Sequence, residues 1–313
     1  MFVMMNAARL AVGTQGVAIA ERAYQQALEF SRERRQGRSA KGGDGKGEVG
    51  MSPIIEHPDV QRMLMTMKAY AHAARGICHL TAASLDLASH GRTEEERAAG
   101  ANRAALLTPI AKAFSTDLGD EATSIGVQIH GGMGFIEETG AAQHMRDSRI
   151  AAIYEGANGI HGVDLVLRKL PLAGGATARN EVNGIRDVAR AVSERGGAAF
   201  GATSARLSEA AEALDQATRA MQAWLATDTE SALAGASPYL RLFGLTLGGA
   251  CLAKAGLAAE ALARQGDDSE LARVALARFY AEKLLPVAPG LNRIVASGAG
   301  AHSAYEAVLA DVQ

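Results

Sequence analysis

Aromatic residues are scarce in this chain of 313 residues, of which Phe, Trp and Tyr make up only 4%. Hydrophobic residues nevertheless make up 48%, so the chain can bury a substantial core. Alanine is abundant, and small side chains suit close-packed helices better than sheets, which favour aromatic and β-branched residues. The composition therefore predicts an all-α protein, and the length allows one large domain or two ordinary ones.

The chain also lacks an excess of charge of either sign, because its formal net charge at pH 7 is -2. Proteins that bind nucleic acid usually carry a strongly basic surface, along a groove or on one face. Nucleic acid is therefore not expected as the main partner of this protein.

Cysteine is rare, since only Cys78 and Cys251 are present and they do not form a Cys-x-x-Cys pair. We interpret both as buried thiols in a reducing compartment. We find no apolar run of the roughly 20 residues that a membrane-spanning helix needs. Residues 1–20 also lack the basic flank and apolar block of a signal peptide. These absences predict a cytoplasmic protein without a membrane span.

Apolar residues at helical spacing dominate the first part of the chain. The predicted helices cover 1–36, 60–90, 95–129, 139–149 and 157–170. Pro109 should kink or divide the third of them, and the fourth has a cap-like start. The first helix begins at residue 1 with no capping signal before it, which suggests that the chain comes from inside a longer architecture. Residues 39–52 contain five glycines and predict a surface loop.

The segment 170–176 resembles an inter-domain linker, because it combines proline, two glycines and small residues. It predicts two domains, an antiparallel helical bundle over 1–171 and a second helical bundle over 178–313. Helices of the second domain are expected at 180–195, 204–227, 238–264, 269–284 and about 301–312. Ser237 and Pro238 are the expected cap and first residue of the third. We find no catalytic motif there and interpret this domain as a packing or oligomerisation bundle.

Glycines are concentrated directly after the third predicted helix. Gln128 precedes Gly131, Gly132 and Gly134, and bare glycine backbone lets a phosphate or a sugar approach closely. A dinucleotide-binding fingerprint would have to follow a strand, so this cluster is not one. From the residues alone, an ordinary turn between two helices is the favoured interpretation.

Further along, Glu155 stands between Tyr154 and Gly156, after the apolar run 150–153. Apolar neighbours raise the pKa of a carboxylate and make it a usable base near neutral pH. The start of the helix that follows would lower the same pKa. The residues alone do not decide which influence prevails.

The two segments QIHGGMGF (128–135) and IYEG (153–156) together resemble the last part of the flavin domain of the acyl-CoA dehydrogenase family. The variant YEGANGI and the tail after it are most similar to the long bacterial branch, which includes the methylthiopropionyl-CoA dehydrogenases. The resemblance identifies residues 1–170 as flavin-domain helices and the rest as the extra helical domain of that branch. It also implies that the family's N-terminal helical domain and middle β-domain are missing here.

The resemblance implies that FAD is the cofactor and that an acyl-CoA thioester is desaturated to a trans-2-enoyl-CoA. Glu155 then removes the α-proton of the substrate, while Tyr154 and Gly156 border the thioester. Electrons would pass to an electron-transfer flavoprotein. The related acyl-CoA oxidases remain an alternative interpretation, because the sequence says nothing about oxygen access to the flavin.

The resemblance also implies contacts with FAD. Arg34 takes the position of an arginine that binds the FAD pyrophosphate, usually of a neighbouring subunit, although Gly37 and Arg38 replace the family's Phe-Gly. The glycine segment would bind the adenosine half across the same interface. The implied FAD-binding residues are Arg34, Gln36, Gln128, Gly131, Gly132, Gly134, Ala157 and Gly159. A homodimer or homotetramer is therefore expected.

Two other classes of protein deserve comparison with this reading. One is a catalytically incomplete helical fragment that serves oligomerisation only, which bound flavin would distinguish. The other is a metal-dependent helical-bundle oxidase, which needs Glu-x-x-His on its core helices. None of the eight histidines follows a Glu by three residues, so no metal site is expected.

Overall fold

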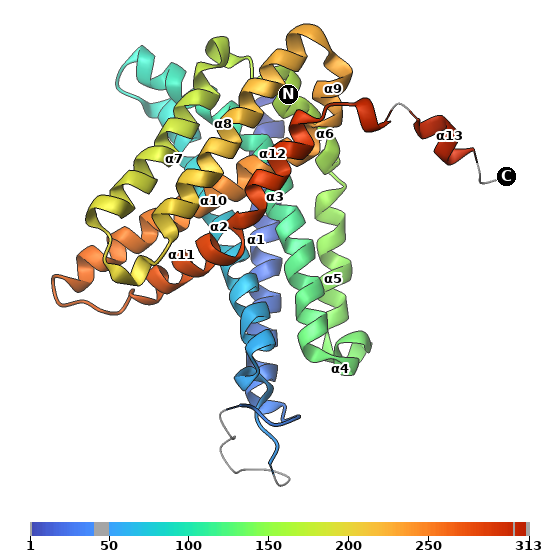
Figure 1. Cartoon of the computed structure of the whole chain (residues 1–313), viewed down its shortest axis with the longest axis vertical. Coiled ribbons are helices and arrows are strands. Elements are labelled where there is room, and N and C mark those ends of the chain that lie inside the picture. The colour runs from blue at the N-terminus through green and yellow to red at the C-terminus, as the bar shows by residue number, and fades with distance from the viewer. Residues whose placement is uncertain (1, 41–49, 303, 311–313) are drawn as a thin grey trace.

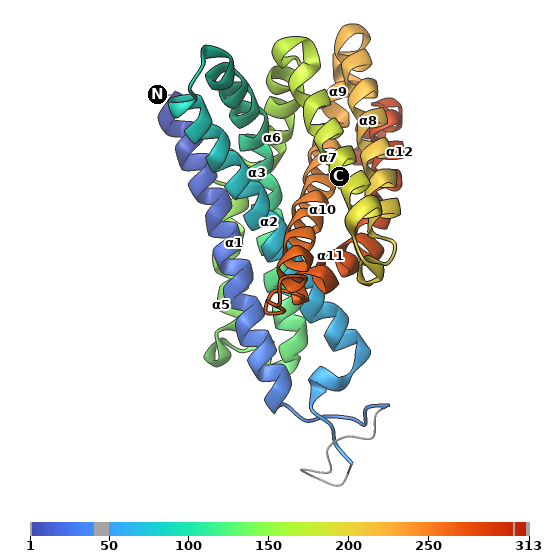
Figure 2. The same cartoon turned by 90° about the vertical axis from the view of Figure 1, so that its left-hand side faces the viewer.

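Three long helices form the frame of the molecule, α1 (Phe2–Glu33), α2 (Pro58–His90) and α3 (Glu94–His130). The structure is a computed structural model that describes residues 2–40, 50–302 and 304–310. Within these residues there are helices and no β-strand, apart from one isolated antiparallel bridge between Arg35 and Pro53. The all-α prediction is confirmed. Figures 1 and 2 show the three helices side by side, with the other helices beside them.

Local signals explain where these helices begin. Pro58 occupies the first position of α2, where a missing backbone N–H costs nothing. At the start of α3, the Glu96 backbone N–H donates to the Thr93 hydroxyl (3.1 Å) and the Thr93 N–H donates to the Glu96 carboxylate (3.3 Å). This capping box satisfies two backbone donors that the helix leaves free. Pro109 lies inside α3 and does not divide it, so that part of the prediction was wrong.

Small residues let α1 and α3 approach closely. A side chain added at Gly13 or Gly16 of α1 would lie 2.5 Å from a backbone oxygen of α3, that of Ala111 or Ser115. Such distances are too short for any Cβ atom, so glycine is required at both positions. The abundance of small side chains therefore indicates close helix packing, as the composition predicted.

Short helical pieces complete the first half: α4 (Gly132–Phe135), α5 (Ala141–Arg149) and α6 (Asn158–Asp164), which continues as a π-helix (Leu165–Lys169). The prediction of a cap-like start for α5 was wrong, because the cap residue is Gly140 and no side chain bonds to the helix end. Most of the predicted surface loop over 39–52 lies outside the described residues. At its described ends, the Gln36 N–H donates to the Ser52 carbonyl (3.0 Å).

The second half begins with α7 (Ala176–Arg195), four residues earlier than predicted. Its other helices are α8 (Thr203–Thr227), α9 (Thr229–Ala234), α10 (Ala236–Ala263), α11 (Ala272–Lys283), α12 (Ala288–Ala296) and α13 (Tyr305–Leu309). Short 3₁₀ turns link elements along the chain at Ile54–Glu56, Glu137–Thr139, Ile150–Ala152, Leu172–Gly175, Ala198–Phe200, Leu285–Val287 and Gly300–His302.

The prediction missed α9 and α12 and expected a longer last helix. Of the predicted range 301–312, the structure describes only a 3₁₀ turn and α13, while residues 303, 311 and 312 lie outside the described part. The predicted cap at Ser237 was wrong, because α10 already begins at Ala236 after Gly235.

One hydrophobic core joins the two halves. It runs from Ile77 in α2 and Phe114 in α3 to Val182 in α7, Leu214 in α8 and Phe243 in α10. A smaller core lies between α1, α2 and α3. The boundary between two domains therefore stays a prediction, since apolar packing continues across it.

Helix α10 lies at the centre of the second half and corrects another expectation. By length and composition alone it could cross a membrane, contrary to the absence of such a run that the sequence suggested. However, 72% of its most apolar stretch is buried inside the protein, as in a core helix. Both cysteines are free. Cys78 is buried as predicted, whereas Cys251 of α10 is only partly buried, so the prediction of a buried thiol was wrong there.

Candidate functional site

Residues at the end of α1 and at the end of α3 line a pocket of about 620 Å³. Figure 1 shows the ends of both helices in the lower part of the molecule. Four predicted FAD-binding residues line it: Arg34, Gln36, Gly131 and Gly132. Arg34 and Gly131 are 97 positions apart in the sequence, so only the packing of α1 against α3 brings them together. Gln128 is exposed nearby and does not line this pocket.

Hydrogen bonds and ring stacking hold the walls of this pocket. The guanidinium of Arg34 donates to the side-chain oxygen of Gln36 (3.2 Å), and both side chains are exposed. The His57 ring donates to the backbone carbonyl of Gln36 (2.8 Å). In the same pocket, the rings of Phe30 and His130 stack with centroids 4.4 Å apart. These hydrogen bonds hold the turn after α1, and the exposed Arg34 guanidinium lies on that turn.

The three glycines of this segment differ in their surroundings. Gly131 has a φ of +59°, and a Cβ at Gly131 or Gly132 would have no atom within 4 Å. Their backbone is therefore open to a ligand, which fits the phosphate or sugar of a nucleotide cofactor. Gly134 is buried, and its Cβ would lie 2.3 Å from the Val127 carbonyl oxygen. Gly134 is thus required for packing.

A second group of predicted residues lies on the turn before α6. Glu155 is exposed and its backbone has a φ of +56°, a value that residues other than glycine rarely adopt. Gly156 follows with a φ of +91°. The Tyr154 hydroxyl donates to the side chain of Gln15 in α1. Ala157 and Gly159 are both exposed at the start of α6.

Buried Lys112 of α3 lies beneath this turn. Its amine donates to the Gly156 carbonyl and to the Asn158 side-chain oxygen, both at 2.8 Å. The Asn158 amide in turn donates to the hydroxyl of Thr116 (2.9 Å) and to the carboxylate of Asp117 (2.6 Å). Burial lowers the pKa of Lys112 to about 8, although the nearby Asp117 acts in the opposite direction.

His161 of α6 hydrogen-bonds to the backbone carbonyl of Glu155, the residue before Gly156. Its ring Nε2 donates to the backbone oxygen of Glu155 (3.1 Å), and the ring is buried. Burial lowers the pKa of His161 to about 4, and the charges of Lys112 and Arg9 act in the same direction. The imidazole is therefore neutral at pH 7. Two buried donors thus fix consecutive carbonyls and leave the Glu155 carboxylate facing solvent.

Sequence reasoning did not assign a role to Lys112, Asn158 or His161. One usable signal was present: Lys112 lies within the mostly apolar stretch 104–114 of the third predicted helix. A lysine inside an apolar helix must find hydrogen-bond acceptors, because an unpaired buried charge is costly. Its partners could not be named, since Gly156 lies 44 positions away.

The two groups of predicted residues occupy different places. Tyr154 contacts Gln15 of α1, and Arg34 follows Gln15 by 19 residues. This corresponds to roughly 28 Å along a helix axis. The pocket around Arg34 and the turn around Glu155 are therefore separate along the bundle. Among the described residues, no three His, Cys, Asp or Glu side chains lie close enough to hold a metal ion.

Family models match both halves of the chain. The model described as "Acyl-CoA dehydrogenase, C-terminal domain" matches residues 2–170, and "Acetyl-CoA dehydrogenase C-terminal like" matches residues 181–305. The chain belongs to the acyl-CoA dehydrogenase family, which confirms the resemblance found in the sequence.

Known relatives agree with this assignment. The chain is 45% identical over 287 residues to 3-methylmercaptopropionyl-CoA dehydrogenase from Ruegeria pomeroyi, covering 91% of this chain and 48% of the relative. It is 30% identical over 292 residues to a butyryl-CoA dehydrogenase from Syntrophomonas wolfei, covering 91% and 47%. The chain therefore spans about half the length of these curated relatives.

A solved structure shares the fold. The crystal structure of an acyl-CoA dehydrogenase from Bacillus anthracis, complexed with FAD, superposes with a TM-score of 0.71. The match covers 94% of this chain and 49% of that one, at 19% sequence identity. At this identity the likeness shows the fold, and both helical halves take part in it.

Proposed function

We propose that this chain supplies the helical FAD-binding part and the catalytic base of an acyl-CoA dehydrogenase. The enzyme would desaturate an acyl-CoA thioester to a trans-2-enoyl-CoA. One observation carries the proposal: Arg34 and Gln36 meet Gly131 and Gly132 around a single pocket, although the two segments are far apart in the sequence.

The chemistry of that pocket suits the phosphate-bearing half of FAD. A guanidinium presents a planar fork of N–H donors that matches phosphate oxygens, and Arg34 is exposed for this contact. Gly131 and Gly132 leave space where other residues would place a side chain. Gln36 adds an exposed polar side chain beside the arginine.

Glu155 is the proposed base that removes the α-proton of the thioester. Its carboxylate is exposed, while Lys112 and His161 hold the adjoining backbone from below. A turn fixed in this way keeps the carboxylate at one place, as proton transfer requires. Tyr154, held by Gln15, would border the substrate. Bound FAD would accept the β-hydride, and an electron-transfer flavoprotein is the proposed electron acceptor.

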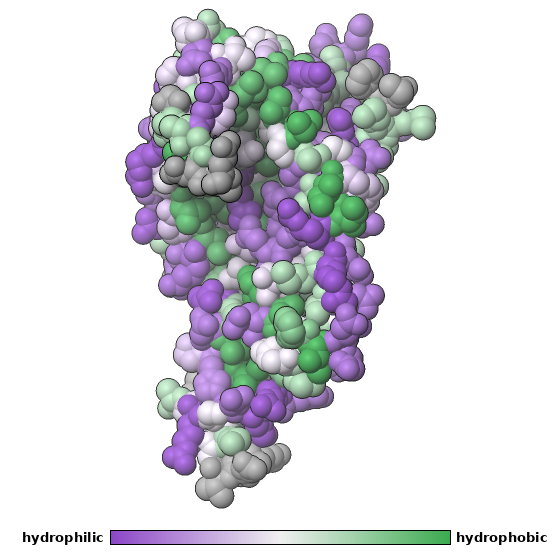
Figure 3. Space-filling view, turned by 90° about the vertical axis from the view of Figure 1, so that its right-hand side faces the viewer, coloured by the Kyte–Doolittle hydropathy of each residue, from purple (hydrophilic) through white to green (hydrophobic). Residues whose placement is uncertain are grey.

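The separation of the two groups supports an oligomer. Because the Arg34 pocket and Glu155 are roughly 28 Å apart along α1, we propose that they serve the FAD of two different subunits in a homodimer or homotetramer. Exposed apolar side chains accompany α4 to α6, among them Phe135, Ile153 and Ile160. Figure 3 shows apolar patches on this face, and such patches often mark interfaces.

Flavin titration tests the proposal. The purified chain is titrated with FAD, followed by gel filtration with absorbance detection of co-eluting flavin. Arg34→Met should weaken FAD binding roughly tenfold or more, because a hydrogen bond to a charged group is lost. Arg32→Met is the matched control, since Arg32 is equally exposed on α1 but lies outside the pocket. A wild-type chain that oligomerises without retaining flavin would favour the assembly-only alternative.

A further inference from the structure

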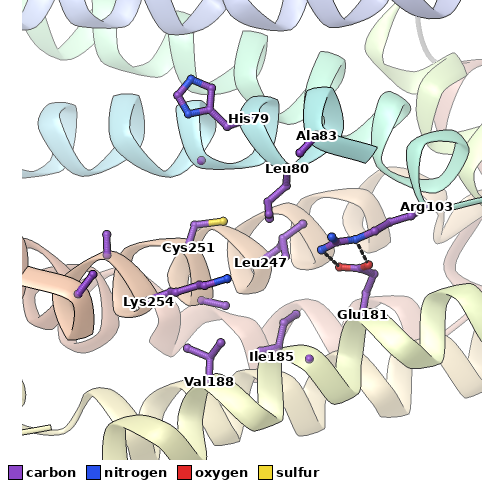
Figure 4. A pocket seen from close by; sticks show the side chains of 15 residues that line it. His79, Leu80, Ala83, Arg103, Glu181, Ile185, Val188, Leu247, Cys251 and Lys254 are labelled. Carbon is purple, nitrogen blue, oxygen red and sulfur yellow. Dashed lines mark hydrogen bonds and ion pairs between the residues drawn. The ribbon is translucent and has the colours of Figure 1, made fainter. Parts of the chain in front are cut away.

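A second pocket, of about 590 Å³, lies between α2, α7 and α10 (Figure 4). None of the residues discussed above as FAD or substrate contacts lines it. Its walls are mainly apolar and include Leu80 of α2, Ile185 and Val188 of α7, and Leu247 and Ala250 of α10. Its volume falls in the range of small-molecule sites, about 300–1,000 Å³.

Three charged side chains line this apolar pocket, and they differ in whether they have a partner of opposite charge. At one end, Arg103 binds Glu181 through two hydrogen bonds of 2.5 and 3.1 Å, so these two charges neutralise each other. Lys254 of α10 lies elsewhere on the wall, and Figure 4 shows its amine turned toward the space between Cys251 and Ile185. Within the described parts of the chain, Lys254 forms no hydrogen bond or ion pair. The pocket therefore offers one free positive charge.

A recess of about 340 Å³ adjoins this pocket. It shares His79 and Cys251 with the pocket and is also lined by His72, Arg75 and Arg273. No acidic side chain lines the recess among the described residues. Arg75 pairs with Glu21 (2.8 Å) and Arg273 pairs with Glu270, so these arginines are already neutralised and Lys254 is the charge that the pocket offers to an anion.

Covalent chemistry is not expected in this pocket. Burial raises the pKa of Cys251 to about 12, so the thiol stays protonated at neutral pH and is a poor nucleophile. Helices α2 and α10 touch closely beside it, since a Cβ at Gly76 would lie 2.7 Å from that of Cys251. On the opposite helix, a Cβ at Gly184 would meet no atom within 4 Å, so Gly184 opens directly onto the space.

We propose that this pocket binds an aliphatic carboxylate of fatty-acid type. The hydrocarbon chain would lie along the apolar wall formed by α7 and α10, where its burial removes apolar surface from water. The carboxylate would lie at the Lys254 amine, which has no other anionic partner in the described chain. The ligand would contact both halves of the chain, and its binding requires neither FAD nor the proposed dehydrogenase activity.

Head-group selection is the first test. The purified chain is titrated calorimetrically with decanoate, and with decanol as an uncharged probe of the same length. Lys254→Met should weaken decanoate binding roughly fivefold, as expected for a partly solvated ion pair, and leave decanol binding unchanged. Lys283→Met, which removes an exposed lysine outside the pocket, should change neither. Decanoate binding that Lys254→Met leaves unaltered would overturn the proposal.

Filling the pocket is the second test. Gly184→Leu places a side chain in the open space, and leucine is a better helix former than glycine, so the variant should fold. Both decanoate and decanol should lose measurable binding in this variant. Ser193→Leu, at an exposed position of the same helix outside the pocket, should bind both as the wild type does. No decanoate binding by the wild type, or undiminished binding by Gly184→Leu, would refute the site.

Discussion

The two halves of this chain treat ionisable side chains differently. In the first half, Lys112 and His161 are buried and hydrogen-bond to neutral oxygens. In the second half, the least exposed carboxylates, Glu181 and Asp215, both pair with arginines. Burying an ionisable group without an opposite charge costs stability. Such a buried group therefore indicates a position where a fixed local geometry outweighs the loss of stability. This difference fits the proposal that the catalytic base lies in the first half.

Backbone strain also distinguishes the first half of the chain from the second half. Among the described residues other than glycine, only Glu155 and Ala173 have a positive φ. A left-handed conformation costs roughly 1–2 kcal/mol for such residues. Ala173 lies in the connection between the halves, whereas Glu155 lies on the turn that Lys112 and His161 support. The strain at Glu155 is thus held in place by buried hydrogen bonds.

Replacing the proposed base should have the largest effect. Glu155→Gln keeps the shape of the side chain but cannot accept the α-proton. In the flavin-loaded protein, formation of enoyl-CoA should fall roughly 10²–10⁴-fold, followed by the absorbance of the product. Stability and bound flavin should not change, because Glu155 is exposed. Glu138→Gln, another exposed carboxylate, is the control; a Glu155→Gln rate close to that of the wild type would argue against the base assignment.

Removing the support beneath the turn should have the next largest effect. Lys112→Met leaves the Gly156 carbonyl and the Asn158 side chain without their donor. Each buried group that loses its partner costs about 1–3 kcal/mol, so unfolding by denaturant should show a loss of about 3 kcal/mol. The exposed Lys254→Met should change stability by less than about 0.5 kcal/mol. If both variants lost the same unfolding free energy, the proposed difference between the lysines of the two halves would be wrong.

The same lysine predicts a dependence on pH. Burial lowers the pKa of Lys112 to about 8 in the folded chain, against a usual value of 10.5. Between these values the unfolded chain binds more protons than the folded chain, so this lysine makes stability rise with pH. The difference in unfolding free energy between wild type and Lys112→Met should therefore widen from pH 8 to pH 10. A difference that narrows over this range would contradict the buried position of the amine.

Two glycine variants separate packing from ligand contact within the first half. Gly134→Ala should destabilise the fold by about 1–3 kcal/mol, because the added methyl group overlaps the Val127 carbonyl. Gly132→Ala should leave stability unchanged and weaken FAD binding, because its Cβ would enter open space in the pocket. Thermal unfolding and flavin titration of both variants measure this. Unchanged FAD binding by Gly132→Ala would show that the open backbone does not contact the cofactor.

A variant in the second half should have the smallest effect. Tyr239→Phe removes a buried hydroxyl that bonds to Thr218 at 2.9 Å. Thr218 still donates to the Leu214 carbonyl (2.7 Å), so the loss should be about 1 kcal/mol. FAD binding should be the same as in the wild type. A loss of flavin from this variant would mean that the second half also shapes the cofactor site.

Much of the helical architecture could be predicted, because periodicity over many turns outweighs local ambiguity. The start of α3 carried its own signal in Thr93 and Glu96. By contrast, α9 has only six residues and α12 only nine, too few for a clear period. The start of α10 was misplaced, because Ser237 and Pro238 imitate a cap that the chain does not use.

The sequence by itself determined the helical fold, the family and the main candidate residues. Composition and apolar spacing act locally along a helix, and the motifs around Gly131 and Glu155 are continuous in the chain. Only the tertiary structure decided that Lys112 lies under the Glu155 turn, that Gly134 packs while Gly132 stays open, and that a pocket forms between α2 and α10. These features depend on contacts between helices whose residues are distant in sequence, and the close packing of small side chains sets those contacts.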